Sequence, residues 1–154
     1  MKQKITLLVF VVLTSMFAFG QNRVHNLSKK QRLDSLILKE SDTNTYKYEF
    51  GYDANGNRKV QFYIQWNSET QKWEYNDNAS KEEYIYDANG NETSCIFSNF
   101  DGTTQEWINS SKYEYTYDAN GKMTAHITSI FNSTTQEWII SYKYEFGYDA
   151  NGKQ

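Results

Sequence analysis

The sequence predicts an all-β fold: an antiparallel β-meander of about eight strands, built from tandem hairpins in one open or curled sheet. Three observations predict it. The 154 residues include thirteen Tyr, nine Phe and four Trp but no Pro, and aromatic residues favour strands. The tetrapeptide Asp-Ala-Asn-Gly occurs four times, at spacings of 34, 31 and 31 residues. Between these motifs, apolar and polar residues alternate as they do in half-buried strands.

The first twenty residues differ from the rest of the chain. Lys2 and Lys4 give a positive start, Ile5 to Phe19 are almost all apolar, and Ala18 and Gly20 are the small residues that a signal peptidase reads. A membrane-spanning helix needs about 20 apolar residues, so an uncleaved anchor is the less favoured alternative. We therefore predict a cleaved signal peptide at 1–20, a lead-in at 21–32, and a protein that is secreted or on the cell surface.

The net charge bears on which partners the chain can bind, and the cysteine content bears on whether it forms a disulfide. Cleavage would remove two lysines and no acid, so the formal charge would change from −3 to −5. An acidic chain without a Lys/Arg cluster repels phosphate backbones, so we predict no nucleic-acid partner. We also predict no membrane contact beyond the signal peptide. Cys95 is the single cysteine, and it cannot form an internal disulfide; we expect a buried thiol rather than one that pairs between molecules.

Asp-Ala-Asn-Gly has the chemistry of a tight turn. Its Asp can accept hydrogen bonds from the backbone ahead, Ala and Asn suit the central positions of a type I turn, and Gly supplies the positive φ that follows. The predicted structural turns are marked by their first and last residues: Asp53 and Gly56, Asp87 and Gly90, Asp118 and Gly121, and Asp149 and Gly152. A second polar turn, Thr-Gln-(Lys/Glu)-Trp, lies 20 residues after each of the first three Asp residues, as counted to its Trp.

The two kinds of turn divide the repeat domain, 33–154, into strands. A capped helix start at 28–31 is the alternative for the first of them, but the alignment with later repeats favours a strand. Three additional residues in the first complete repeat are placed in 75–83, as a bulge or a widened strand entry. The predicted strands are 33–40, 45–53, 58–67, 72–87 (interrupted), 92–100, 105–117, 122–131 and 136–148.

Alternation within these strands predicts where the rings lie. From Trp138 to Tyr148 the aromatic residues share one parity, as do Trp107 and Tyr113 to Tyr117 in the preceding repeat. Residues of one parity point to one face of a strand. We therefore expect a ladder of aromatic residues on a single face of the sheet. The chain ends inside a turn, which predicts an array that has been cut short at the C-terminus.

The segments YEYTYDANGKM (113–123) and YEFGYDANGN (48–57) resemble the YD repeat, also called the RHS repeat, whose mark is Tyr-x-Tyr-Asp-x-x-Gly. The resemblance covers roughly 33–154, and short secreted arrays with a Trp between the YD marks resemble proteins of Bacteroidota-type bacteria. It implies a β-sheet array of the kind that builds cell-surface proteins and toxin shells, some of them described as carbohydrate-binding. The Arg-Leu that often follows the family's Gly is absent, and the repeats are longer than usual.

No residue pattern predicts catalysis or a cofactor. Asp-x-Asn-Gly-Asn at 53–57 and 87–91 is similar to part of a calcium loop, but it lacks the Gly at position six and the Glu at position twelve, so a plain turn is favoured over calcium. His25 and His126 do not repeat, and neither has the neighbouring ligands or nucleophile that a metal site or a triad needs. We predict a protein that is not an enzyme and has no metal or other cofactor.

The aromatic residues are the feature that suits binding. Flat rings with polar tips fit sugars and protein surfaces, although their first role is to form a core. The candidate binding residues are Trp73, Trp107, Trp138, Tyr115 and Tyr144. We predict a binding module for a glycan or for another surface protein, with self-association as a further possibility. The alternatives are a structural spacer or shell fragment without a ligand, and the degenerate product of a longer array.

Overall fold

The structure is a computed structural model that describes residues 32–39 and 45–149. The predicted signal peptide, most of the lead-in and Gly152 lie outside the described residues. The described part of the chain contains no helix, and so none that is long and apolar enough to cross a membrane.

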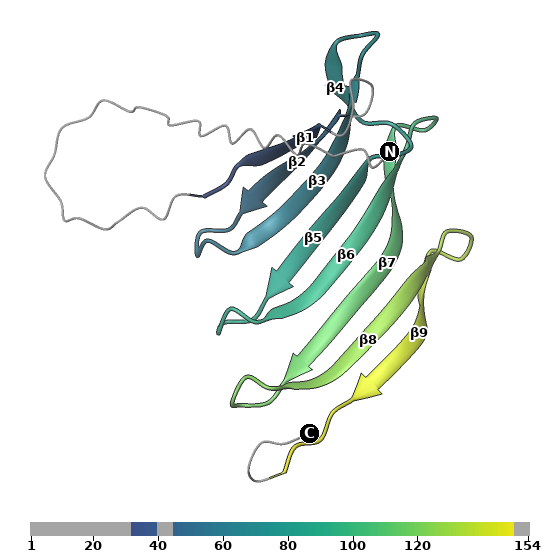
Figure 1. The fold of residues 1–154 in the computed structure, drawn as a ribbon. Coiled ribbons are helices and arrows are strands. Elements are labelled where there is room, and N and C mark those ends of the chain that lie inside the picture. Colours follow the sequence, from purple (N-terminus) through teal and green to yellow (C-terminus); the bar gives the residue numbers. More distant parts are fainter. Residues whose placement is uncertain (1–31, 40–44, 150–154) are drawn as a thin grey trace, which may run out of the picture.

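The described residues form one open antiparallel sheet (Figure 1). Its strands follow one another in sequence order, β1-β2-β3-β5-β6-β7-β8-β9, and the short β4 pairs only with β3. This confirms the predicted all-β meander. The strands are β1 (Ser35–Lys39), β2 (Thr45–Tyr52), β3 (Arg58–Asn67), β4 (Lys72–Glu74), β5 (Ser80–Tyr86), β6 (Glu92–Asp101), β7 (Glu106–Tyr117), β8 (Met123–Asn132) and β9 (Glu137–Glu145).

The structure has nine strands where the sequence predicts about eight. The difference lies in the predicted interrupted strand 72–87, which is two strands, β4 and β5, joined by a loop at 75–79. β3 pairs with both of them, with β4 through Gln65 to Asn67 and with β5 through Val60 to Tyr63. The three additional residues of this repeat therefore form a loop between two short strands.

Each Asp-Ala-Asn-Gly motif within the described residues forms a turn that connects two paired strands, and its glycine has a positive φ. In the second one, the N–H of Gly90 donates to the carbonyl oxygen of Asp87 (3.1 Å), and the N–H of Asp87 donates to that of Asn91 (2.9 Å). Gly90 has φ +86°, which a residue with a Cβ adopts at a cost. The same two bonds recur at Asp53 and at Asp118. These turns close the hairpins β2–β3, β5–β6 and β7–β8.

The Asp side chains stabilise these turns by accepting hydrogen bonds from backbone N–H groups later in the turn. Oδ1 of Asp87 accepts from the backbone N–H groups of Asn89 (2.9 Å) and Asn91 (2.8 Å). The side-chain amide and backbone N–H of Asn91 hold the pKa of Asp87 below its ordinary value of 3.8. The backbone N–H of Lys122 does the same for Asp118. At Asp53, burial raises the pKa, but hydrogen bonds from Asn57 outweigh it and the net pKa is lowered.

These lowered pKa values predict acid sensitivity. A carboxyl whose pKa is lower in the folded chain adds stability that is complete above its unfolded value, here 3.8, and is lost as pH falls through the folded value. We expect the melting temperature to fall with pH below that value, and to fall less steeply in Asp87→Asn/Asp118→Asn. Thermal unfolding by circular dichroism across this range measures both slopes. Parallel slopes in the two proteins would contradict the assignment.

The second kind of turn is also held by the residue that precedes it. Oδ1 of Asp101 accepts from the N–H groups of Thr103 (2.8 Å) and Thr104 (3.0 Å), and Asn67 and Asn132 act in the same way. Each turn closes at a Gln with positive φ: Gln71 (54°), Gln105 (61°) and Gln136 (58°). The side chain of Gln105 compensates by donating to the carbonyl oxygen of Gly102 (2.6 Å).

A β-bulge in the middle of β7 and another in β9 make the single-face prediction wrong. Phe97 pairs with Ser111 and Ser98 pairs with Asn109, so Ser110 has no partner across the ladder. Ser141 is skipped in the same way between Ile140 and Tyr142. One additional residue reverses the alternation. Trp107 and Tyr113 therefore lie on opposite faces despite their equal parity, and so do Trp138 and Tyr144.

The pairing registers sort the rings into two faces, because directly paired residues share a face. The tyrosine face is defined by Tyr48, Tyr63, Phe97, Tyr113, Tyr115, His126 and Tyr144. The tryptophan face is defined by Phe62, Trp66, Trp73, Phe100, Trp107, Phe131 and Trp138. The rings of Tyr115 and Tyr144 stack on either side of His126, at 5.0 and 6.1 Å between centroids.

The tyrosine that precedes each turn Asp ties one hairpin to the previous one. The hydroxyl of Tyr117 donates to the carbonyl oxygen of Glu92 (2.8 Å), 25 residues earlier in the chain. Tyr52, Tyr86 and Tyr148 make the equivalent bond to Leu33, Arg58 and Met123. The Tyr-Asp pair of the repeat thus has two structural functions, a bond between hairpins and a turn within one.

Tyr117→Phe removes this bond and keeps the ring. We expect it to lower the free energy of unfolding by about 0.5–1.5 kcal/mol, the net value of a hydrogen bond in a protein. Urea unfolding followed by circular dichroism measures the loss. Tyr142→Phe is the control, because the Tyr142 side chain is 62% exposed and we expect no change there. Equal stability of the Tyr117 variant and the wild type would show that the bond adds nothing.

Candidate binding surface

The tryptophan face carries one aromatic cluster, made of Phe62, Tyr75, Phe100 and Trp107. The ring of Trp107 lies 5.2 Å from that of Phe100, 5.4 Å from Tyr75 and 5.8 Å from Phe62, between centroids. It packs on the buried residues of the described chain that form one hydrophobic core, Ile64, Ala79 and Phe100. The cluster therefore joins β3, β6 and β7 with the loop that separates β4 from β5.

The loop at 75–79 makes this part of the sheet different from the other repeats. It occupies the place of the bulge that Ser110 and Ser141 form elsewhere. Ala79, which is 1% exposed, accepts a backbone bond from Phe100 (3.1 Å). Oδ1 of Asp77 accepts from the N–H of Gly102 (2.7 Å). These contacts fix the loop over the neighbouring turn and bring Tyr75 onto the cluster.

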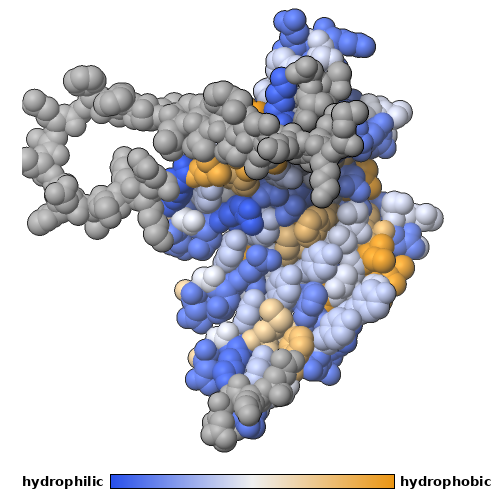
Figure 2. Space-filling view, in the orientation of Figure 1, coloured by the Kyte–Doolittle hydropathy of each residue, from blue (hydrophilic) through white to orange (hydrophobic). Residues whose placement is uncertain are grey.

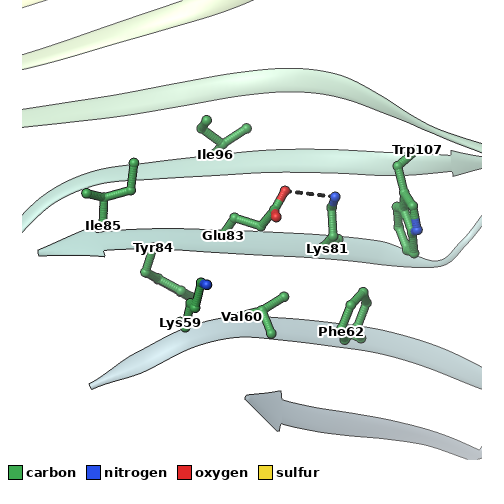
Figure 3. A pocket seen from close by; sticks show the side chains of 9 residues that line it. All are labelled: Lys59, Val60, Phe62, Lys81, Glu83, Tyr84, Ile85, Ile96 and Trp107. Atoms are coloured by element: carbon green, nitrogen blue, oxygen red, sulfur yellow. Dashed lines mark ion pairs between the residues drawn. The ribbon is translucent and has the colours of Figure 1, made fainter. Parts of the chain in front are cut away.

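A groove of about 570 Å³ opens beside the cluster on the tryptophan face. Figure 3 shows Trp107 at one end of it and Ile85 at the other, with Val60 and Phe62 along β3. Ile96 of β6 completes the apolar lining. Ile85 is 57% exposed, so apolar surface meets solvent along the groove. Figure 2 views the sheet from the side opposite to Figure 3; on that face the apolar patches are separated by polar residues.

An ion pair lies over this apolar lining. Nζ of Lys81 is 2.7 Å from a carboxylate oxygen of Glu83 and 5.5 Å from the centroid of the Trp107 ring. The Lys81 side chain is 18% exposed and that of Glu83 is 51% exposed. The groove therefore offers a donor and an acceptor of opposite charge beside a half-buried indole ring.

The same ion pair and ring contact repeat along the tryptophan face. Lys47 pairs with Glu49 and lies 5.1 Å from the Trp73 ring; Lys112 pairs with Glu114 and lies 5.3 Å from the Trp138 ring. Each lysine thus lies over the tryptophan of the following repeat. Such cation–π contacts stabilise by about 0.5–1 kcal/mol at exposed sites. The repeated ion pair and ring contact are therefore a structural feature of the array. At Lys81, Glu83 and Trp107 they also line a groove.

The structure does not bring the five predicted binding residues together. Trp73, Trp107 and Trp138 lie on the tryptophan face, all half-buried, but only Trp107 lines the groove. Trp73 packs on Trp66 (5.2 Å) and, like Trp107, on the core of Ile64, Ala79 and Phe100. Trp138 packs on Phe131 (5.0 Å). Tyr115 and Tyr144 belong to the opposite, tyrosine face.

Sequence reasoning missed the other groove residues. Phe62, Ile85 and Ile96 could not be grouped with Trp107, because the positions of the bulges decide which residues of neighbouring strands lie on the same face. The Lys-x-Glu pattern at 47–49, 81–83, 112–114 and 143–145 was a usable signal, since it repeats as regularly as the turns. The three additional residues of the first complete repeat were a second usable signal, because they lengthen its spacing to 34 residues where the later two are 31.

The described residues include no group of three or more His, Cys, Asp or Glu that could hold a metal ion. Cys95 is buried on the tyrosine face, where burial raises the pKa of its thiol to about 12. Such a thiol is almost entirely protonated at neutral pH, and the protonated form is a poor nucleophile. The thiol therefore serves as a small apolar side chain in this sheet.

Comparison with known proteins places the fold but not the activity. No protein-family model matches the chain, and no curated protein matches it. A crystal structure of a protein of unknown function from Bacteroides fragilis is 22% identical, with a TM-score of 0.64, over 80% of this chain and 91% of that one. A DUF3836 family protein from Bacteroides vulgatus is 20% identical, with a TM-score of 0.51, over 66% of this chain and 98% of that one. At these identities the likeness establishes a shared open antiparallel β-sheet fold.

Proposed function

We propose that this chain is an exported, non-enzymatic β-repeat protein that binds a glycan in the Trp107 groove. The observation that carries the proposal is the combination of a half-buried indole, an exposed apolar lining and the Lys81–Glu83 ion pair in one groove. The apolar C–H face of a sugar ring packs on an aromatic ring, and its hydroxyls need donors and acceptors at the rim. The resemblance of the turns to YD repeats of surface proteins supports the same reading.

The charges favour a neutral glycan over an anionic one. Of the three charged residues that line the groove, Lys81 and Glu83 neutralise each other at 2.7 Å, and Lys59 remains as a local positive charge. At long range the net negative charge of the chain outweighs this single lysine. The chain as a whole is acidic, with a formal charge of −3. An anionic polymer would meet unfavourable long-range repulsion on approach. A neutral polysaccharide would lie along the groove from Trp107 towards Ile85.

Glycan-array binding followed by calorimetry on the best ligand tests this function. We expect Trp107→Ala to weaken binding about thirtyfold or more, which corresponds to the roughly 2 kcal/mol of an aromatic hot spot. Trp138→Ala is the matched control, because this residue occupies the equivalent place one repeat later and lies outside the groove. We expect it to leave affinity unchanged.

Because Trp107 also packs on the core, a second variant separates binding from folding. Glu83→Gln removes one charge from a side chain that is 51% exposed, and we expect weaker binding at an unchanged melting temperature. Absence of binding by the wild type to any neutral glycan would contradict the proposal. So would a Trp107→Ala protein that is folded and binds as the wild type does.

A further inference from the structure

The outer edge of β9 differs from every interior strand. Within the described residues β9 pairs only with β8. Four of its large side chains are more than half exposed: Ile139 (54%), Ile140 (62%), Tyr142 (62%) and Tyr144 (53%). Lys143 and Glu145 repeat the ion pair of the interior strands, but the Lys143 side chain is 50% exposed, against 15–19% for Lys47, Lys81 and Lys112. An apolar strand with an unpaired edge is a template for another strand.

We propose that this edge pairs antiparallel with the β9 edge of a second copy of the chain, about a two-fold axis at Tyr144. The backbone N–H and C=O groups of β9 are oriented as this pairing requires. Just beyond the strand, the N–H of Phe146 donates to Thr124 of β8 (2.9 Å). In an antiparallel ladder, alternate residues bond to opposite sides. The N–H and C=O groups of Lys143 and Glu145 therefore point away from β8, towards the open edge.

The side-chain charges select the register. With the axis at Tyr144, Lys143 of each copy lies opposite Glu145 of the other, and Tyr144 lies opposite itself. Centring the axis on Lys143 would place lysine opposite lysine, and centring it on Glu145 would place glutamate opposite glutamate. Like charges directly opposite each other destabilise a pair of strands, whereas opposite charges and aromatic pairs stabilise it. The self-complementary register is the one centred on Tyr144.

Head-to-tail pairing with β1 of another copy fits less well. Ile37 pairs with Lys47 as Ile127 pairs with Lys143, so Lys39 of β1 holds the place of Ser129 in β8. Ser129 lies opposite Lys112 in the β7–β8 hairpin. A β1 strand that continued the array in this way would bring Lys39 opposite Lys143. A head-to-tail contact would also extend into open chains, whereas the two-fold contact closes as a dimer.

Disulfide trapping reads this register directly. In a Cys95→Ser background of the full chain, Tyr144→Cys places two thiols in a non-hydrogen-bonded pair, where the Cα atoms are about 4.5 Å apart and a disulfide can form. We expect a covalent dimer after mild oxidation. Tyr142→Cys is the control: its two copies would be four residues out of register, about 13 Å apart, and we expect no covalent dimer.

Oligomeric state without cross-linking gives the second readout. We expect the wild type to sediment as a dimer at high concentration, Lys143→Glu to sediment as a monomer, and the swap Lys143→Glu/Glu145→Lys to restore the dimer. Circular dichroism checks that each variant is folded. A wild type that stays monomeric would overturn the proposal, as would open-ended oligomers. Equal trapping of the Tyr142 and Tyr144 variants would also overturn it.

Discussion

Phe100→Ala is expected to lower the free energy of unfolding by about 3–5 kcal/mol, as large-to-small changes of buried aromatic residues do. Phe100 is 8% exposed and lies at the centre of the one hydrophobic core among the described residues, against Ile64 and Ala79. Its ring also contacts those of Tyr75 (5.5 Å) and Trp107 (5.2 Å). A single-layer sheet has few such residues, so the loss is a large part of a total that is typically about 5–15 kcal/mol.

The chain offers a matched control for this prediction. Phe131 holds the equivalent position one repeat later, but it is only half-buried, and among the aromatic rings of the described residues it contacts that of Trp138 (5.0 Å) and no other. Since the cost scales with the apolar area that is removed from water, we expect Phe131→Ala to cost less than half as much as Phe100→Ala. Urea unfolding of the three proteins measures both. Equal costs would mean that the cluster around Phe100 is not the main core.

Deletion of Ser110 is expected to be at least as damaging, by about 3 kcal/mol or more, because it removes the bulge of β7. Without the additional residue, the segment that carries Trp107 must either turn over or lose its pairing with β6. Trp107 would then leave Phe62 and Phe100, and its partner Phe100 would lose part of its cover. The expected cost is that of truncating a large aromatic side chain.

Substitution at the same position separates the bulge from the serine. Ser110→Ala keeps the number of residues and removes only the long 3.4 Å bond from its hydroxyl to the carbonyl oxygen of Phe97. We expect a change within about 0.5 kcal/mol, as for most substitutions away from a core. Thermal melts and urea titrations compare the two variants. A deletion variant as stable as Ser110→Ala would show that the bulge does not position Trp107.

The turns of this chain could be predicted from the sequence. The face of the sheet on which each aromatic ring lies could not. Asp87, Asn89 and Gly90 identify their turn on their own, because each residue type suits its place in a type I turn with a following positive φ. A bulge such as Ser110 carries no comparable signal, since serine suits many backbone conformations. One unrecognised residue reversed the parity of Trp107 and so merged two faces into one.

The candidate groove was lost for the same reason. Trp107 was named from the sequence as a candidate binding residue, but its neighbours Phe62 and Ile85 come from strands whose face depends on register. The loop at 75–79 was located within its repeat, and its effect, which is to place Tyr75 on the cluster, required the three-dimensional contacts. Long-range packing of this kind is decided by tertiary structure and not by the local sequence pattern.

Nuclear Overhauser contacts of the Trp107 indole test the claim that the bulges divide the rings between two faces. The structure predicts contacts from this indole to the rings of Phe62 and Phe100, together with a separate set between Phe97 and Tyr113. Contacts from the Trp107 indole to the ring of Tyr113 or Phe97 would contradict the claim, because they would place both sets of rings on one side of the sheet.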